Sequence, residues 1–309
     1  MELRELAAFR EVARQSSFSR AASRLGYVQS TVSAQVQALE QDLGVRLIDR
    51  LGRSIALTVA GQALLPHAER LLDLSTEARS AVSTAVAGGA RLTGTISVSA
   101  PESLLTYRVP AVLSLFRARQ PGVTVELRPT AIGRFRGETR RAIATGLADL
   151  AFVLDAPLNL AGFGSEMLRI EPISVIAPAG HRLGTHRGDR PTRPAALDGE
   201  IILLPEAPDS GCAYRGQFER QLAEDHVSLD GALEFASIET VKQCVIAGMG
   251  VSVLPTVAVA TEIKAGRLAE LRWRDSFDVQ TQLVWNARRT ISPAQEAFMA
   301  TAREALRAD

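Results

Sequence analysis

The segment from residue 18 to residue 61, FSRAASRLGYVQSTVSAQVQALEQDLGVRLIDRLGRSIALTVAG, constrains the fold more than any other part of this chain. Two short helical patterns flank a tight turn at Leu25-Gly26-Tyr27. A hairpin pattern with arginines at its tip follows, and then a helical pattern that has no early stop. This order of elements predicts a winged helix-turn-helix.

Amide and hydroxyl side chains gather near the start of the third predicted helix. The first helix is predicted over about 3–15, Ser17 or Ser19 is a candidate N-cap for the second, and the third covers about 29–43. Short uncharged polar groups can hydrogen-bond base edges and phosphates, whereas an ordinary exposed helix face usually carries Glu and Lys. We therefore predict contacts to double-stranded DNA from Arg20, Gln29, Ser30, Thr31, Ser33 and Gln35.

Residues 45–58 predict a β-hairpin whose turn lies at Leu51-Gly52. Arg50 and Arg53 lie at its tip, where a guanidinium group can reach a phosphate or the minor groove. The alternative is that both arginines are ordinary solvated turn residues.

A long helix is predicted from Thr58, its candidate N-cap, to about residue 86. Small and apolar residues repeat along it at spacings of four and three: Leu64, Ala68, Leu71, Ser75, Ala78, Val82 and Ala85. An isolated long helix can bury such a face only against a partner, so the pattern favours a symmetric dimer. Because most of these side chains are small, this helix alone would hold a dimer weakly.

After a glycine-containing hinge at 88–94, strand patterns alternate with helical patterns. Strands are predicted at TISVSA, VTVELRPT, ADLAFVL, ISVIAP, IILLP, GVSVLP and TQLVWNA. Helices are predicted at about 103–119, 135–146, 212–224, 238–248, 256–265 and 293–307. This alternation indicates an α/β fold with largely parallel sheets.

The run AASRLG…QSTVSAQVQALEQDLGVRLIDR…LTVAG resembles the LysR-type transcriptional regulators, and the resemblance spans the predicted winged helix-turn-helix and the long helix. It implies an all-α winged helix-turn-helix DNA-binding domain at 1–58 and a dimerising linker helix at 59–87. It also implies that residues 95–309 form an α/β, periplasmic-binding-protein-like effector domain. The two subdomains of that domain would cover about 95–164 with 268–309 (subdomain I) and about 165–267 (subdomain II).

The resemblance also implies the partners of the chain. They are promoter or operator DNA, a small-molecule effector, further copies of the chain in a homodimer and homotetramer, and RNA polymerase, with no cofactor and a cytoplasmic location. Three residues depart from the family pattern: Val28 where a serine cap is frequent, Ala34 where an arginine is frequent, and Ile48 where a wing phenylalanine is usual. The first two bear on operator sequence and affinity and not on the fold.

Candidate effector contacts lie at the carboxyl ends of predicted strands and at helix starts, where ligands bind in open α/β sheets. They are Ser99, Glu102, Ser103, Thr130, Ser210, Cys212 and Ser237. Each serine could instead simply cap a helix. A carboxylate at residue 102 repels an anion unless Arg134, Arg136 or Arg215 offsets its charge. We therefore expect an effector with hydrogen-bond donors or a cationic group.

Cys212 has an alternative role as a redox sensor, because it lies in SGCAYR at a predicted helix start, where a thiol ionises more readily. By resemblance, peroxide-sensing members of the family carry their reactive cysteine in a similar context. They also carry a resolving cysteine a few turns later, where this chain has Gln221. Cys244 is expected to be buried on a different helix. We therefore favour an inert or pocket-lining Cys212 over a redox sensor.

Composition and missing motifs argue against other classes of protein. The formal net charge is +1, so any basic surface must be local. The chain has no apolar run of membrane-spanning length and no secretory signal, which argues against a transport-type binding protein. It has no nucleophile elbow and no phosphate-binding glycine loop, so we expect no enzyme activity. His181 and His186 lack a nearby cysteine or a clear carboxylate partner, so we expect no metal site.

Overall fold

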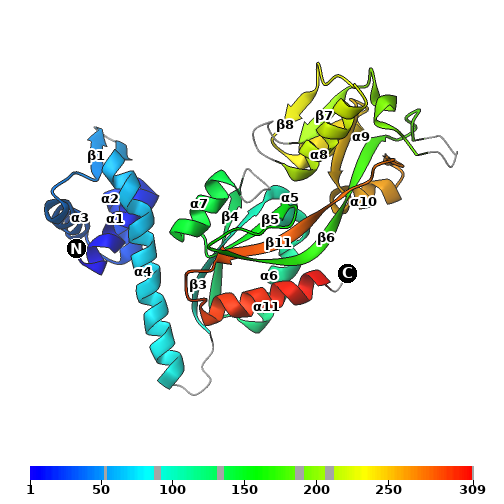
Figure 1. The fold of residues 1–309 in the computed structure, drawn as a ribbon. Coiled ribbons are helices and arrows are strands. Elements are labelled where there is room, and N and C mark those ends of the chain that lie inside the picture. Colours follow the sequence, from blue (N-terminus) through cyan, green and yellow to red (C-terminus); the bar gives the residue numbers. More distant parts are fainter. Residues whose placement is uncertain (52–53, 87–91, 131–135, 185–190, 206–211, 308–309) are drawn as a thin grey trace. The chain divides into compact units, whose positions relative to one another are not determined.

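The computed structural model describes residues 1–51, 54–86, 92–130, 136–184, 191–205 and 212–307 (Figure 1). The chain divides into two units, Met1–Thr95 and Ile96–Asp309, with the short segment Thr145–Leu147 grouped with the first. Each unit is described by itself. Most of the expected hinge at 88–94 lies outside the described residues.

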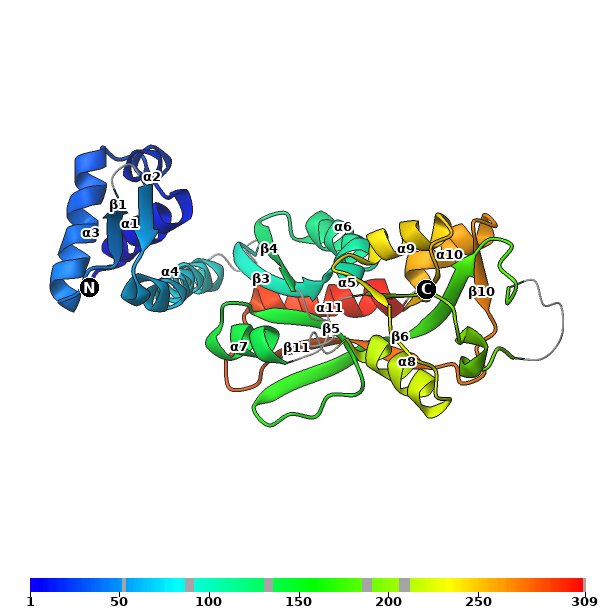
Figure 2. The same cartoon turned by 90° about the horizontal axis from the view of Figure 1, so that it is seen from above.

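The N-terminal unit is a winged helix-turn-helix followed by a long helix (Figures 1 and 2). Its elements are α1 (Leu3–Gln15), α2 (Phe18–Leu25), α3 (Gln29–Leu43), β1 (Ile48–Leu51), β2 (Ser54–Leu57) and α4 (Val59–Val86). Phe9, Val32 and Leu39 are fully buried and form the centre of its core, and burial of such side chains is the main stabilising contribution to the fold. The predicted winged helix-turn-helix is confirmed.

Capping residues set the tight turn between α2 and α3. The Ser17 hydroxyl accepts a hydrogen bond from the amide of Arg20, at 3.3 Å, and so caps α2. Gly26 ends α2 with φ 71°, in the left-handed region that favours glycine. Ala21 and Ala22 are buried, and their small side chains allow the other helices to approach closely.

The C-terminal unit is an α/β fold built on a nine-stranded sheet, in the order β4-β3-β5-β11-β6-β9-β7-β8, with β10 paired to β6. Its strands are β3 (Gly94–Pro101), β4 (Val123–Thr130), β5 (Leu150–Asp155), β6 (Phe163–Pro178), β7 (Ile202–Pro205), β8 (Leu233–Phe235), β9 (Val251–Pro255), β10 (Leu268–Leu271) and β11 (Asp278–Asn286). Its helices are α5 (Glu102–Tyr107), α6 (Val109–Arg119), α7 (Gly137–Thr145), the short 3₁₀ turn η1 (Pro194–Leu197), α8 (Ala213–Glu224), α9 (Ile238–Ile246), α10 (Thr256–Lys264) and α11 (Pro293–Arg307).

Two long strands, β6 and β11, run along the unit and divide it into two subdomains (Figures 1 and 2). The first part of β6 pairs with β11 in subdomain I, and its last part pairs with β9 and β10 in subdomain II. We expected the chain to return to subdomain I near residue 268. In the structure Leu268–Leu271 forms β10, which pairs with the end of β6.

Strand directions are mixed, whereas the sequence predicted largely parallel sheets. The pairs β3–β5, β7–β8 and β7–β9 are parallel, as alternation with helices requires. The strands that cross between subdomains pair antiparallel with their neighbours, so β11–β5, β11–β6, β6–β9 and β6–β10 are all antiparallel.

The helix predicted over 103–119 is two helices, because the backbone breaks at Arg108 with φ −122° and ψ −49°. Pro110 lies in the first turn of α6 and has no amide hydrogen to continue the hydrogen bonding of α5. Behind α6, the rings of Phe116, Phe152 and Phe298 meet edge to face, with centroids 5.1 and 6.2 Å apart. This aromatic group joins α6, β5 and α11 in the core of subdomain I.

Candidate functional sites

The start of α3 presents polar side chains to solvent, as the sequence predicted for a DNA-contacting helix. Gln29 and Ser30 are exposed, whereas Thr31 and Ser33 are half-buried. Gln35 is also half-buried, and its Oε1 atom is buried without a hydrogen-bond partner. Of the α3 residues predicted to contact DNA, Gln29 and Ser30 are therefore the most accessible.

The outer face of α2 carries a shallow hollow of about 490 Å³ lined by Gln15, Ser19, Arg20, Ser23 and Arg24. Arg20 was predicted as a DNA contact and is exposed, and its Nη2 donates to the carbonyl oxygen of Gln15 at 2.6 Å. Arg24 has a side chain that is 73% exposed, with its Nε 3.3 Å from Glu11. The sequence did not predict Ser23 or Arg24 as DNA contacts, although their spacings of three and four from Arg20 place them on its helix face.

The wing is tied to α3 by Glu40. One carboxylate oxygen of Glu40 accepts hydrogen bonds from the amides of Leu47 and Ile48, at 2.8 and 3.1 Å. Arg50 lies on β1 opposite Ile55, which places it on the wing as expected. Arg53, the second predicted wing contact, lies outside the described residues.

The first part of the heptad pattern on α4 packs inside the N-terminal unit itself. Ala68 is fully buried and Leu64 is half-buried in the core shared with α1. The Arg14 guanidinium on α1 also pairs with the Glu69 carboxylate on α4, at 3.0 Å. Further along the helix, Leu71 and Leu74 are 38% and 61% exposed. The exposed leucines of the helix therefore lie beyond Ala68.

The predicted effector contacts lie on both subdomains. Ser99, at the end of β3, is 2% exposed, and its hydroxyl has no hydrogen-bond partner. Ser103 is also buried, Thr130 is half-buried at the end of β4, and Cys212 is the 5% exposed N-cap residue of α8. Ser210 and Arg134 lie outside the described residues.

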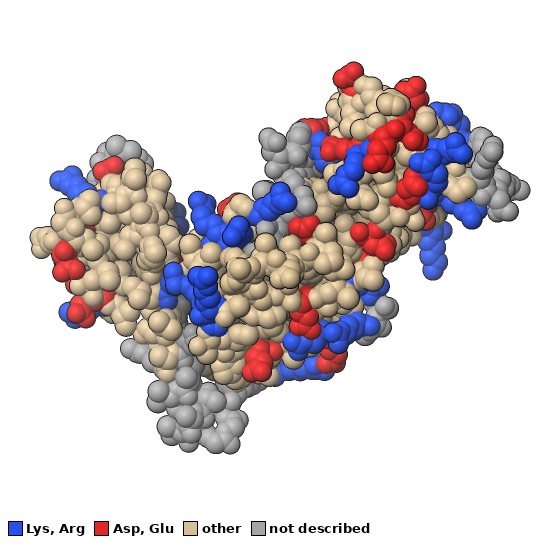
Figure 3. Space-filling view, viewed as in Figure 1, with Lys and Arg blue, Asp and Glu red and all other residues tan. Residues whose placement is uncertain are grey.

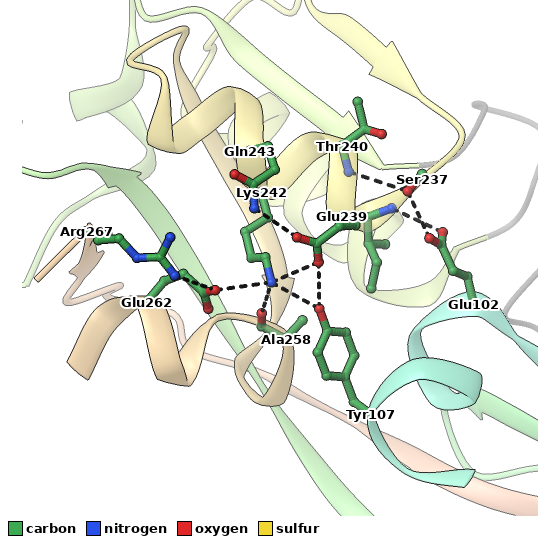
Figure 4. A network of polar contacts seen from close by, with 11 residues as sticks. Glu102, Tyr107, Ser237, Glu239, Thr240, Lys242, Gln243, Ala258, Glu262 and Arg267 are labelled. Carbon is green, nitrogen blue, oxygen red and sulfur yellow. Dashed lines mark hydrogen bonds and ion pairs between the residues drawn. The ribbon is translucent and has the colours of Figure 1, made fainter. Parts of the chain in front are cut away.

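Glu102 and Ser237, two of the predicted effector contacts, bind each other across the subdomains (Figure 4). The Ser237 hydroxyl donates to Glu102 Oε1 at 2.8 Å, and the Ile238 amide donates to Glu102 Oε2 at 3.2 Å. Ser237 is also the N-cap of α9, because its hydroxyl accepts from the amide of Thr240 at 3.4 Å. Ser237 therefore caps α9, which is the alternative role considered for it, and its hydroxyl also donates to Glu102 of subdomain I.

The expectation of an effector with hydrogen-bond donors or a cationic group rests on the negative charge of the Glu102 carboxylate. In the structure both oxygens of this carboxylate accept hydrogen bonds from neutral donors at the start of α9. Arg215, one of the arginines considered as an offset, is buried and pairs with Glu219 and Glu234 at 2.7 and 2.6 Å. Arg136 is exposed just before α7.

A second polar group joins the other end of α5 to α9 (Figure 4). The Tyr107 hydroxyl donates to Glu239 Oε2 at 3.0 Å, and the buried Lys242 ammonium donates to the Tyr107 oxygen at 3.2 Å. Lys242 also lies 2.8 Å from Glu239 and 3.4 Å from Glu262. Burial lowers the pKa of Lys242, but its hydrogen bonds with Glu239 and Tyr107 outweigh burial and raise that pKa above the usual 10.5.

The next contacts concern the cysteines and histidines for which the sequence raised a redox or metal-binding role. Gln221, which stands where a resolving cysteine would be, donates to the carbonyl oxygen of Asp275 at 2.7 Å and accepts from the indole of Trp273 at 2.7 Å. Cys244 is half-buried, where we expected a buried residue. His181 lies 3.2 Å from Glu200, a carboxylate partner that the sequence did not reveal, and His186 lies outside the described residues. In the described ranges, no group of three His, Cys, Asp or Glu side chains could hold a metal ion.

Two further features concern surfaces. Figure 3 shows the Lys and Arg side chains in several separate groups, in keeping with a net charge of +1 and a local basic surface. Across the parts of the chain with described structure, every helix is too short or too polar to cross a lipid bilayer.

Comparisons with known proteins match both units. Residues 3–62 match the family model of bacterial regulatory helix-turn-helix proteins of the LysR family, and residues 89–307 match the LysR substrate binding domain. The chain is 33% identical to the uncharacterized HTH-type transcriptional regulator YwqM of Bacillus subtilis (strain 168), over 98% of this chain and 99% of that protein. It is 32% identical to the HTH-type transcriptional regulator CbbR of Rhodospirillum rubrum, over 99% of this chain and 97% of that protein.

Solved structures show the same fold. A full-length OxyR variant from Pseudomonas aeruginosa superposes with a TM-score of 0.72 at 24% identity, covering 100% of this chain and 95% of that one. Full-length CbnR complexed with its target DNA superposes with a TM-score of 0.69 at 21% identity, covering 99% of this chain and 100% of that one.

Proposed function

This chain belongs to the LysR-type transcriptional regulators, and we propose that it binds operator DNA as a symmetric dimer under the control of a small-molecule effector. The exposed polar start of α3 carries the proposal. Gln29 and Ser30 face solvent at the amino end of a helix that follows a tight turn. In a helix-turn-helix, this end of the second helix enters the major groove.

Arginines on the elements beside α3 are suited to contact the phosphate backbone of DNA. Arg20 and Arg24 are exposed on α2, where guanidinium groups would contact phosphates and fix the position of the protein on the duplex. Arg50 and Arg53 on the wing would add phosphate or minor-groove contacts. Thr31, Ser33 and Gln35 complete the set of DNA-contacting residues that we propose.

The effector would act through the C-terminal unit. We propose that it binds between the two subdomains, at Ser99, Glu102, Ser103, Thr130, Ser210, Cys212 and Ser237. An effector changes DNA binding only if it binds one arrangement of the subdomains more tightly than the other. Homotetramer formation and a contact with RNA polymerase belong to the same proposal.

Fluorescence anisotropy with DNA from upstream of the protein's own gene tests DNA binding by the full chain. We expect Gln29→Ala to weaken binding about tenfold, because a lost pair of base contacts costs about 1–3 kcal/mol. Arg20→Ala should weaken binding to all sequences and reduce its dependence on salt concentration. Gln41→Ala is the matched control, since Gln41 is exposed near the far end of the same helix. Equal affinities for the Gln29 and Gln41 variants would refute the proposed role of α3.

A further inference from the structure

Both ends of helix α5 form hydrogen bonds with the first part of α9, although the two helices belong to different subdomains (Figure 4). At its start, Glu102 accepts hydrogen bonds from the Ser237 hydroxyl and the Ile238 amide. At its end, Tyr107 donates to Glu239 and accepts from Lys242. We call these two contacts together the α5–α9 latch.

The first of these contacts uses groups that a ligand would otherwise use. The amides in the first turn of a helix have no partner within the helix, and they suit an anionic acceptor. Here the chain supplies that acceptor itself, since the Glu102 carboxylate binds both the capping hydroxyl and the first amide of α9. Glu102 is half-buried, so solvent reaches the contact.

A second observation, on the strand just before Glu102, points to a ligand. The hydroxyl of Ser99, on the strand that leads into α5, is buried and has no hydrogen-bond partner. An unpaired buried hydroxyl is destabilising, so this arrangement leaves one donor unsatisfied on the strand that leads into α5 while the Glu102 carboxylate is bound to α9.

We propose that Glu102 is a built-in competitor of the effector. In the absence of effector, its carboxylate occupies the start of α9 and keeps the α5–α9 latch closed. An effector that carries a carboxylate or a similar charged acceptor displaces Glu102 from Ser237 and Ile238, takes a hydrogen bond from Ser99, and so opens the Glu102 contact of the latch. This inference rests on the proposed effector role of the C-terminal unit.

Glu102 has an advantage over a free ligand because it is attached to the same chain as the start of α9. A group attached to the same chain acts at a high effective concentration, so a simple carboxylate competes poorly with it. Removal of the Glu102 carboxylate should therefore both loosen the start of α9 and let a free carboxylate bind there. A residue that was only a fixed structural cap would show the first effect without the second.

The test measures hydrogen exchange at the Ile238 amide of the full chain, by mass spectrometry with fragmentation to single residues. In Glu102→Ala we expect exchange to be at least about tenfold faster than in the wild type. Acetate, but not chloride at equal ionic strength, should slow this exchange in the variant and leave the wild type unchanged. Glu102→Gln keeps the size of the side chain without its charge, and it serves as the second variant should the alanine form fold poorly.

Glu138→Ala is the matched control, because Glu138 is an exposed glutamate in the first turn of α7, another short helix of subdomain I. In this control variant, hydrogen exchange at the Ile238 amide should be as slow as in the wild type. Wild-type exchange in both Glu102 variants would overturn the proposal, and so would faster exchange that acetate fails to slow. The measurement uses neither DNA nor the natural effector, so failure to bind operator DNA would refute the proposed function without altering this result.

Discussion

At the scale of single residues, Arg108 and Glu171 form a buried ion pair where β6 passes between the subdomains. The Arg108 guanidinium donates two hydrogen bonds to the Glu171 carboxylate, at 2.8 and 2.7 Å, and the Thr281 hydroxyl donates a third at 3.1 Å. Both charged side chains are at most a tenth exposed. The pair therefore joins the break between α5 and α6 to both of the crossing strands.

We predict that Arg108→Ala lowers the free energy of unfolding of the C-terminal unit by about 3 kcal/mol, because the buried Glu171 carboxylate then keeps only Arg169, 3.9 Å away, as a charged neighbour. Urea denaturation followed by tryptophan fluorescence measures this unit alone, since the chain's two tryptophans are Trp273 and Trp285. The matched control is Arg119→Ala, which removes an equally two-pronged but exposed pair with Glu304. A similar loss in both variants would contradict the role that we give to burial.

The sequence suggests candidate site residues one at a time, but it does not show which of them contact each other. Glu102 and Ser237 were both chosen from the sequence because each follows a strand or begins a helix, and the structure brings them together. Their contact spans 135 positions along the chain, and no local pattern encodes a contact of that range. Arg108 was hidden for the same reason: within a helical pattern it resembles an ordinary surface arginine, and its partner Glu171 lies on the first part of β6, which the sequence did not reveal.

At the scale of elements, the pKa values of the groups that join α5 and α9 make their contact depend on pH. Burial is the largest single influence on Glu239 and raises its pKa, but hydrogen bonds from Lys242, Gln243 and Tyr107 together lower the pKa below the usual 4.5. A carboxylate whose pKa is lowered by folding stabilises the folded chain when the pH is above the usual pKa of the group. This stabilisation is lost as the pH falls through the folded-state pKa.

We predict that Glu239→Gln is less stable than the wild type at neutral pH, and that the difference shrinks as the pH falls below about 4.5. Urea midpoints measured by tryptophan fluorescence at a series of pH values give this difference directly. Glu138→Gln should match the wild type throughout the series, since Glu138 is exposed. A difference for the Glu239 variant that stayed constant through the acid range would show that the charge of Glu239 does not stabilise the contact.

Elements with a strong period were predicted closely, and short or half-exposed ones were missed. The predicted helices at 29–43 and 293–307 coincide with α3 and α11. The first part of β6 escaped prediction because it lacks an apolar run: it carries Glu166, which accepts two hydrogen bonds from Arg303 of α11. Strands β8 and β10 are only three and four residues long, too short for alternation to be recognised.

At the scale of the whole molecule, the dimer that we propose needs an interface between two copies of the chain, and α4 is the described element best suited to supply it. Leu64 and Ala68 already pack within their own unit, so the dimer contact that the heptad pattern predicts must use later positions. Leu71 and Leu74 are exposed one turn apart on this helix. Each contributes about 1.5–3 kcal/mol when fully buried, and each occurs twice in a symmetric dimer.

We therefore predict that replacing both Leu71 and Leu74 with glutamate shifts the full chain from dimer to monomer in sedimentation equilibrium, because four buried leucines become four charges in contact. Operator affinity should fall with it, since each copy would then bind a single half-site. Val59→Glu places the same charge on an apolar position of α4 that is 85% exposed and outside the heptad pattern, and it should remain dimeric. If the double variant also sedimented as a dimer, the C-terminal units would have to hold the two copies together, and α4 would serve only to set the distance between their DNA-binding units.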